Sequence, residues 1–315
     1  MKKQKTDVFG TLFRRRLLLL LVCLLFLYVV LPQIGSFSDS VDILKKVDVP
    51  LVFAACLGIF LTYILSTIMY ILLATKRLND LATFWVQVAN GFASRLLPAG
   101  LGGLTLNAQY LRKQKHTLGQ AVAVVSMNNI LGFVGHVLLM LVGLFASGQI
   151  TVRRLEVPHL GVLASVFLGL ILLGIVGVLL MPSLRKRLVL VIKDVFGTWL
   201  AYHKRPKCII SALVVSLGIT AAYALVLFFC SLALGVNLSF WEIYEVFTFT
   251  VLASVVVPTP GGLGGAEAGI AVGLISYSVP TPQAVAVTLL FRLLTYWLPM
   301  IPGFIAFLAI RKKYL

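Results

Sequence analysis

The sequence is poor in charge, and above all in acid. Its 315 residues include 27 Lys and Arg but only 10 Asp and Glu, and charged residues make up 12% of the chain. Soluble domains have about 25% charged and roughly 45–50% apolar residues, whereas 60% of this chain is hydrophobic and its mean hydropathy is +1.03. A soluble globular fold is therefore excluded, and we predict an all-α polytopic membrane protein.

The sequence also lacks the patterns of catalytic and cofactor sites. It has no Ser/His/Asp set, paired catalytic carboxylates, phosphate-binding loop or dinucleotide fingerprint. Four cysteines stand singly in or beside apolar runs, without the Cys-x-x-Cys or Cys/His spacing that holds zinc; they are Cys23, Cys56, Cys208 and Cys230. We interpret them as buried small hydrophobic residues and predict no enzyme activity, no metal and no cofactor.

The net charge of +17 could indicate a nucleic-acid partner, but the basic residues lie in short clusters between apolar runs. No aromatic-interleaved patch or nucleic-acid-binding motif accompanies them, so we expect no nucleic acid. The basic head of the chain and the apolar run after it are also how a secretory signal begins. Because no alanine precedes Ala54, a small-residue cleavage site is missing, and we predict an uncleaved first span.

Long apolar runs are abundant. Six of them reach the roughly 20 residues that a helix needs to span a bilayer, and we predict six spanning helices at 17–34, 50–74, 118–146, 159–181, 208–235 and 283–310. Two further apolar stretches, 82–111 and 241–279, are interrupted by Pro and Gly near their centres. A helix does not run through such a cluster, so each stretch either crosses as a broken helix or turns back.

The distribution of Lys and Arg decides between these alternatives. Short cytoplasmic loops carry the excess of basic residues, and most of the 27 fall on one side only if both interrupted stretches turn back as re-entrant hairpins. Both termini are then predicted to be cytoplasmic. The stretch 183–207 mixes apolar and basic residues and includes Trp199 and Tyr202 near its end. We predict that it is a cytoplasmic amphipathic linker on the anionic inner leaflet.

Two short sequence motifs each occur twice, and the two repeats have nearly the same offset. GLGG occupies 100–103 and 262–265, and QAVAV occupies 120–124 and 283–287. Either match alone is weak in a Gly- and Ala-rich membrane sequence, but two matches at almost the same offset predict an internal duplication.

The predicted units are about 50–147 and 208–311, within a single membrane domain, 1–315. Each unit would be a span, a broken hairpin and a span. With the charge assignment above, the two units enter from opposite faces and are inverted repeats. Many secondary transporters use this architecture to place a substrate site near the bilayer midplane.

Helix breaks at membrane depth need a reason, because lipid cannot hydrogen-bond the freed backbone groups. Such backbone survives where it is buried in protein or lines a wet cavity. Two breaks that enter from opposite faces would bring free N–H groups and the positive ends of half-helices together, which suits an anionic head group. The alternative is that the glycines only let helices pack closely, as small residues do in membranes.

Few ionisable side chains lie at depth, and each is a candidate functional residue because its burial in lipid is costly. Arg95 precedes the first break, Glu267 follows the second, and Arg292 lies in the last span. They could form a head-group site, with an arginine on a phosphate and Glu267 as a proton carrier or ammonium contact. Glu267 and Arg292 could instead form a structural ion pair, brought together by the returning hairpin.

Neutral polar residues complete the predicted substrate site. The repeat offset places Asn129 where the second half has Arg292, so Asn128 and Asn129 would make the site asymmetric. Asn107 and Tyr110 follow the first break and could hydrogen-bond a ligand.

Four stretches carry a resemblance to a known family: SRLLPAGLGGLTLNAQYLRKQK (94–115), QAVAVVSMNNILGF (120–133), VVVPTPGGLGGAEAGI (255–270) and FRLL (291–294). Through them the chain resembles the lysylphosphatidylglycerol synthase transmembrane-region family, over most of its length from about 50 to 311. The PxPGGLGxxE pattern of the second break is the most specific part. The resemblance implies a polytopic inner-membrane domain that moves or handles lipids with charged or sugar head groups.

By position, the resemblance assigns the hairpin acid to Glu267 and the last-span arginine to Arg292. It assigns the hairpin Pro and Gly residues to Pro98, Gly100, Gly102, Gly103, Pro258, Pro260, Gly261, Gly262 and Gly264, to which we add Gly265. The family often has arginine at the positions of Asn107 and Asn129, which leaves a shared head-group preference open. The bifunctional members append a soluble aminoacyltransferase domain; because this chain ends at Leu315, we do not expect it to catalyse that reaction by itself.

These features predict a lipid translocase of the bacterial cytoplasmic membrane. It would move a phospholipid or polyprenyl-linked lipid with a charged or sugar head group through a cleft lined by the two hairpins. Membrane lipids are the expected partners, a separate lipid-modifying enzyme is a further candidate, and the oligomeric state is left open. Two alternatives remain: an ion-coupled transporter of a small anion, and a non-transporting membrane partner of a glycosyl- or aminoacyltransferase.

Overall fold

Helices make up every element of the described part of the chain. The computed structural model describes residues 43–97, 100–147, 182–256 and 259–314, and there the prediction of an all-α protein is confirmed. The elements are α3 (Val49–Leu73), α4 (Asp80–Leu96), α5 (Leu101–Lys113), α6 (Leu118–Ser147), α8 (Pro182–His203), α9 (Pro206–Ala233), α10 (Phe240–Val256), α11 (Gly265–Ser276), α12 (Thr281–Arg292), the π-helix η2 (Leu293–Trp297) and α13 (Leu298–Tyr314).

Among the described residues, four helical segments are long and apolar enough to cross a membrane: Val49–Leu73, Leu118–Gly143, Pro206–Ala233 and Thr281–Arg311. Each coincides with a run predicted from the sequence, and the protein is a multi-pass membrane protein. The predicted spans 17–34 and 159–181 lie outside the described residues, as do Pro98 and Pro258. The full number of crossings therefore stays a prediction.

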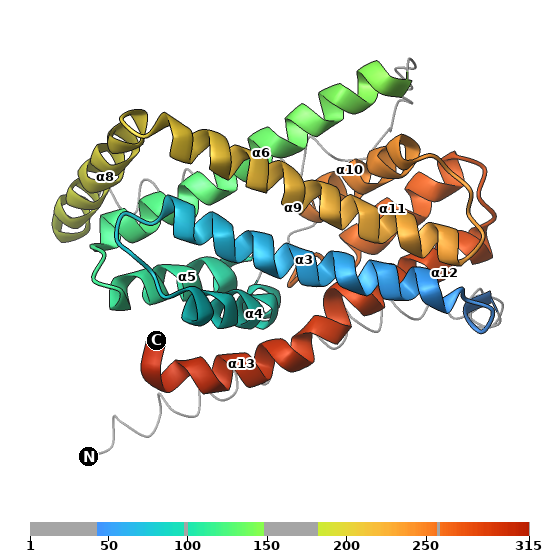
Figure 1. The fold of residues 1–315 in the computed structure, drawn as a ribbon, viewed down its shortest axis with the longest axis horizontal. Coiled ribbons are helices and arrows are strands. Elements are labelled where there is room, and N and C mark those ends of the chain that lie inside the picture. Colours follow the sequence, from blue (N-terminus) through green and yellow to red (C-terminus); the bar gives the residue numbers. More distant parts are fainter. Residues whose placement is uncertain (1–42, 98–99, 148–181, 257–258, 315) are drawn as a thin grey trace.

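The long helices α3 and α9 lie side by side along the molecule (Figure 1). The pair α4 and α5 lies toward one end of them, and the pair α10 and α11 lies toward the other. Each pair packs against the last long helix of the other half of the chain, α4 against α13 and α10 against α6. The two helix pairs are thus held by contacts between the halves as well as within them.

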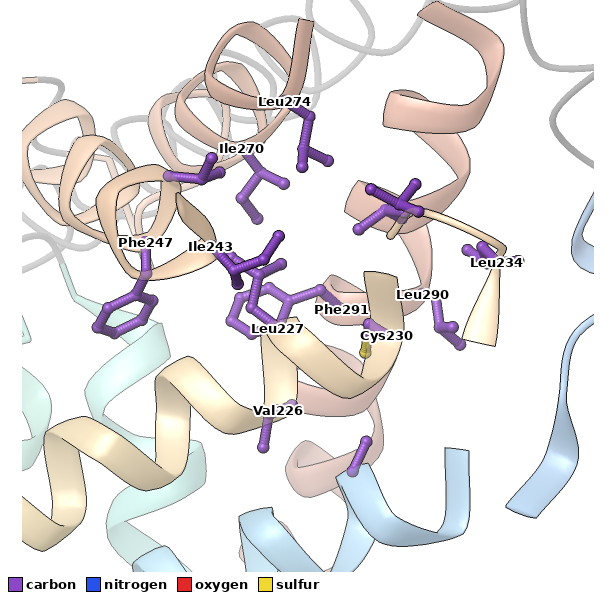
Figure 2. Close-up of a cluster of buried hydrophobic side chains, with 14 of the residues drawn as sticks. Val226, Leu227, Cys230, Leu234, Ile243, Phe247, Ile270, Leu274, Leu290 and Phe291 are labelled. Atoms are coloured by element: carbon purple, nitrogen blue, oxygen red, sulfur yellow. The ribbon is translucent and has the colours of Figure 1, made fainter. Parts of the chain in front are cut away.

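Two hydrophobic clusters stabilise the two ends. One joins α9, α10, α11 and α12 through side chains such as Leu227, Ile243, Ile270 and Phe291, which converge in Figure 2. The other joins α3, α4, α5, α6, α8, α9 and α13. In a bilayer such packing gains little from the hydrophobic effect and depends on close van der Waals contact.

Local sequence explains where several helices begin. Pro50, Pro206 and Pro282 stand in the first turns of α3, α9 and α12, where a missing N–H has no helical partner to lose. Before α4, the Asn79 side chain accepts a hydrogen bond of 2.8 Å from the backbone N–H of Ala82, a typical N-cap.

The two ends of each helix pair lie close together. Before α4, the backbone N–H of Lys76 donates to His116 Nε2 at 3.3 Å, and the Lys76 ammonium contacts the carbonyl of Lys115 beyond α5. Before α10, the carbonyl of Leu234 accepts a hydrogen bond of 2.7 Å from Gln283 of α12. Each pair therefore returns the chain to where the pair began, as a hairpin does. The depth to which either pair enters a bilayer stays a prediction.

The buried imidazole of His116 gives the first of these junctions a pH dependence. Burial lowers the pKa of His116 below its ordinary value, although a hydrogen bond with the carbonyl of Leu111 opposes the shift. The folded protein therefore favours the neutral form of the His116 ring. Its contribution to stability is complete above about pH 6.5, the ordinary pKa of histidine, and is lost as the pH falls through the lower folded pKa.

We expect the thermal unfolding temperature of the purified protein to fall as the pH is lowered from about 7 to about 5, because the protonated ring loses its acceptor for Lys76. The variant His116→Gln keeps a polar side chain that does not titrate, so its unfolding temperature should depend less on pH. Equal pH dependence in the two proteins would contradict this role for His116.

Helix α8 covers the predicted amphipathic linker and packs on the bundle by one face. The Tyr202 hydroxyl donates to the carbonyl of Leu73 at 2.6 Å, and the Trp199 indole donates to the carbonyl of Ala123 at 3.3 Å. Other apolar side chains of the helix are exposed: Val189, Leu190, Ile192, Phe196 and Leu200. Such a helix suits the interface of a membrane, and its cytoplasmic placement stays a prediction.

Candidate functional site

The first helix break lies between α4 and α5, and glycine is needed there for two reasons. Gly100 precedes α5 with a φ of 68°, in the left-handed region that glycine adopts without strain. A Cβ at Gly102 would lie 1.9 Å from the carbonyl oxygen of Ala93. A Cβ at Gly103 would lie 2.2 Å from Asn90 Oδ1. Close packing, the alternative weighed for these glycines, is therefore one of their roles.

The second break, between α10 and α11, ends in a closed first turn. The carboxylate of Glu267 accepts a hydrogen bond of 2.7 Å from the backbone N–H of Gly264, so it satisfies a donor that the helix start leaves free. A Cβ at Gly265 would lie 2.6 Å from the carbonyl of Ala253. Among the described residues of this break, Gly261, Gly262 and Gly264 have positive φ.

Glu267 and Arg292 form the ion pair expected from the sequence. Arg292 Nε lies 2.7 Å from Glu267 Oε1, and Arg292 Nη2 donates to the carbonyl of Gly261 at 3.2 Å. Arg292 is 8% exposed. One arginine of α12 therefore contacts both the loop of the second break and the first turn of α11, and the structure brings together the two residues that the sequence suggested could pair.

Arg95 reaches the same place from the first half of the chain. Its guanidinium carbon lies 5.4 Å from the centre of the Tyr296 ring, and that of Arg292 lies 4.4 Å from it, both within the range of cation–π attraction. Arg95 also donates to the carbonyl of Thr295. We call Arg95, Glu267, Arg292 and Tyr296 the charged cluster.

A local irregularity of the last span makes the contact of Arg95 possible. In an α-helix the carbonyl of Thr295 would accept from the residue four positions later, which is Pro299 and has no N–H. The chain forms the π-helix η2 at this point, and the Thr295 carbonyl accepts from Arg95. π-Helical turns inside α-helices frequently mark functional sites.

A second candidate site is an open cavity of about 210 Å³ between α3, α4, α6 and α9, which we call the polar cavity. Its polar lining includes Ser66, Gln87, Asn90, Asn128, Asn129 and Thr220. Asn128 and Asn129 were predicted as substrate-binding residues, and the structure places both at this cavity, with the side chain of Asn129 exposed.

Asn107 and Tyr110 are not among the residues that line the polar cavity. The Asn107 amide donates to the carbonyl of Gly103 at 3.0 Å and accepts from Gln87 Nε2 at 2.9 Å. The Tyr110 hydroxyl lies 2.9 Å from the Thr83 hydroxyl in a fully buried contact. Both side chains join α5 to α4, and Asn107 acts on the cavity by orienting Gln87.

Sequence reasoning did not single out Tyr296, Gln87 or Asn90. Gln87 and Asn90 could have been found, because amides are uncommon in an apolar stretch such as 82–111 and need partners when buried. Tyr296 carried no such signal, since a tyrosine in a span is ordinary. Within the described residues, no group of three His, Cys, Asp or Glu side chains is placed to hold a metal ion.

The two breaks, the ion pair and most of the last span lie within a known family pattern. A family model described as the lysylphosphatidylglycerol synthase TM region matches residues 16–303. The chain belongs to this family. The resemblance inferred from the break sequences is thereby confirmed, and the match includes the charged cluster and the polar cavity.

Individual relatives of this family member match over shorter stretches. A UPF0104 membrane protein of Methanocaldococcus jannaschii is 40% identical over 68 residues, which is 22% of this chain and 20% of the relative. One from Pyrococcus horikoshii is 28% identical over 130 residues, or 41% and 39%. The phosphatidylglycerol lysyltransferase of Staphylococcus aureus is 31% identical over 80 residues, or 25% and 10%. The chain thus matches less than half the length of each of these proteins.

Proposed function

We propose that the protein is a lipid translocase of the bacterial cytoplasmic membrane, without enzyme activity of its own. It moves a phospholipid or polyprenyl-linked lipid with a charged or sugar head group between the leaflets. The observation that carries the proposal is the charged cluster, in which Arg95 of the first break shares the Tyr296 ring with Arg292, the residue that holds the second break.

The packing of the helices supports this function. A head group needs a path between parts of the protein that move against each other, and inverted repeats provide such parts in secondary transporters. Here α4 packs on α13 and α10 packs on α6, so each helix pair is bound to the opposite half. Two further observations support a transport function: the chain belongs to a family of membrane regions, and its broken helices lie beside an ion pair that is largely buried.

The chemistry of the charged cluster suits a lipid phosphate. A guanidinium offers several N–H donors in a planar fork that matches phosphate oxygens. Arg95 is only partly buried, which leaves it the more accessible of the two arginines. A phosphate at Arg95 would draw its guanidinium from the Thr295 carbonyl and from Tyr296, so binding would loosen the contact between the two halves.

Reconstitution tests the proposal. The purified protein in liposomes should exchange head-group-labelled lipid between leaflets faster than empty vesicles do, for at least one of several anionic and zwitterionic lipids. No exchange above empty vesicles for any of them would overturn it. Gradient-driven uptake of a soluble anion, independent of lipid identity, would instead favour an ion-coupled transporter. Co-purification of a transferase with no transport by the isolated protein would favour a membrane partner.

The proposed membrane orientation makes a separate prediction. In a protein with its native cysteines replaced, single cysteines at the exposed position Arg77 and the partly exposed position Gln114 should react with a membrane-impermeant reagent only from the cytoplasm. Single cysteines at Asn237 and Ser278 should react only from outside. Each pair flanks one broken helix pair, so a re-entrant hairpin keeps both members on one face. Labelling of Arg77→Cys and Gln114→Cys from opposite faces would contradict the re-entrant topology and the assignment of both termini to the cytoplasm.

A further inference from the structure

The polar side chains that line the polar cavity are amides and hydroxyls, and Met69, Gly132 and Ile219 also belong to the described lining. The described residues that line it include no Asp, Glu, Lys, Arg or His. Gln87 and Asn90 come from α4, Asn128 and Asn129 come from α6, and Thr220 comes from α9. Amides and hydroxyls both donate and accept hydrogen bonds. Such a lining matches a ligand that also does both.

The cavity lies deep along the spanning helices. Asn128 is about 15 Å along α6 from Leu118, at a rise of 1.5 Å per residue, and Ser216 is equally far along α9 from Pro206. Half of a hydrocarbon core is about 15 Å thick. Polar side chains at that depth that face an open cavity indicate a binding site or path for a polar ligand.

One acceptor in the cavity wall has no partner. Asn90 Oδ1 is buried and makes no hydrogen bond within the described residues, although buried polar atoms are normally satisfied. The break region of α5 fixes this arrangement, since Gly103 leaves room for the Asn90 amide and Asn107 binds Gln87. This oxygen is closed to solvent and packed against Gly103, so it fixes the position of the Asn90 side chain, and the amide and hydroxyl groups open to a ligand are the other polar groups of the lining.

We propose that the polar cavity binds the neutral, polyhydroxylated part of a sugar-bearing lipid head group. Monoglucosyl diacylglycerol presents such a sugar without a phosphate, so it probes the polar cavity separately from the charged cluster. This inference rests on the proposed function and names the head-group class. At about 210 Å³, the cavity is smaller than the roughly 300–1,000 Å³ pockets that enclose drug-sized ligands, so it holds a head-group moiety and leaves the lipid tails outside.

The same lining disfavours the other head-group classes. An ammonium or a carboxylate would be buried without a counter-charge, which is costly at membrane depth. Asn128 Nδ2 donates to Asn129 Oδ1 at 3.5 Å, and a purely apolar moiety would add no hydrogen bond to the remaining polar groups of the lining. The charged cluster lies apart from this lining, because none of its four residues contributes to the cavity wall.

Direct binding tests the inference without requiring transport. The full chain in phosphatidylcholine nanodiscs is titrated with radiolabelled monoglucosyl diacylglycerol, and in parallel with diacylglycerol and lysylphosphatidylglycerol. We expect saturable binding of the glucosyl lipid, at least about tenfold tighter than that of diacylglycerol. Equal binding of diacylglycerol would show that only the tails bind, and tighter binding of the lysyl lipid that Asn128→Ala weakens would show that the cavity prefers a charged head group; each result overturns the proposal.

Variants locate the binding in the cavity. Asn90→Leu, Asn128→Ala and Thr220→Val should each weaken glucosyl-lipid binding by about tenfold, the effect of one lost hydrogen bond. Asn237→Ala, at an exposed asparagine in the loop after α9, is the matched control and should leave binding unchanged. Thermal unfolding shows which variants fold. Unchanged binding in Asn128→Ala and Thr220→Val would overturn the site even if Asn90→Leu does not fold.

The two proposals fail in different ways. Binding of the glucosyl lipid without any leaflet exchange would remove the translocase function and leave the head-group site in place. Exchange of charged lipids by a protein that does not bind the glucosyl lipid would support translocation and overturn the site.

Discussion

Glu267→Gln and Arg292→Gln, made separately, are each expected to lower the free energy of unfolding by about 3–5 kcal/mol, the usual effect of leaving one buried charge unmatched. The pair is nearly buried and closely hydrogen-bonded, with 2.7 Å between Arg292 Nε and Glu267 Oε1. Glu267 also closes the first turn of α11. Its loss should therefore loosen the second break as well as the pair.

The double variant Glu267→Gln/Arg292→Gln separates a structural role from a functional one. With no buried charge left unmatched, its stability should lie closer to that of the wild type than the sum of the single effects predicts. We expect it to be produced and inserted at near-normal level and yet to be inactive in leaflet exchange, because the Arg292 guanidinium on the Tyr296 ring is gone. Arg112→Gln, at an exposed arginine of α5, is the control. Wild-type transport by the double variant would show that the ion pair has only a structural role.

Gly261→Ala is expected to be the most disruptive conservative change in the second break. Gly261 has a φ of 64°, and a Cβ there would lie 2.3 Å from Tyr296 Cε2. Alanine in the left-handed region costs roughly 1–2 kcal/mol, and forcing an added carbon into a packed contact costs about 1–3 kcal/mol more. The Tyr296 ring would have to leave the two guanidinium groups, so both stability and leaflet exchange should fall.

A matched glycine separates the two causes. Gly100 of the first break has a φ of 68°, and nothing lies within 4 Å of the position that its Cβ would take. Gly100→Ala should therefore show only the backbone cost of roughly 1–2 kcal/mol. Thermal unfolding of the two variants in detergent gives the difference. Equal losses would mean that the contact of Gly261 with Tyr296 contributes nothing.

The charged cluster was partly predictable. Arg95, Glu267 and Arg292 were candidates because ionisable groups in apolar stretches are rare and costly, and the contact of Glu267 with Arg292 followed from the hairpin between them. The approach of Arg95 to the last span could not be predicted, since it joins residues 200 positions apart through the carbonyl of Thr295. It depends on how α4 packs against α13.

The roles of the uncharged candidate residues were even harder to predict from the sequence. Asn107, Tyr110, Asn128 and Asn129 are alike from the sequence, as polar side chains in apolar segments. In the structure the first two make contacts that join α5 to α4, and the last two face an open cavity. The two pairs of residues differ in role because neighbouring helices cover the face of α5 that carries the first pair and leave open the face of α6 that carries the second.

The sequence by itself determined the class of protein, the described spanning segments and the places where helices break. These are properties of short stretches: hydropathy, length and the presence of Pro and Gly act within one or two helical turns. Only the tertiary structure decided that Arg95 and Arg292 share one tyrosine, that Asn90 Oδ1 has no hydrogen-bond partner among the described residues, and that the described lining of the polar cavity carries no charge. Those outcomes depend on the rotation and register of packed helices, which contacts between distant segments set and local composition does not encode.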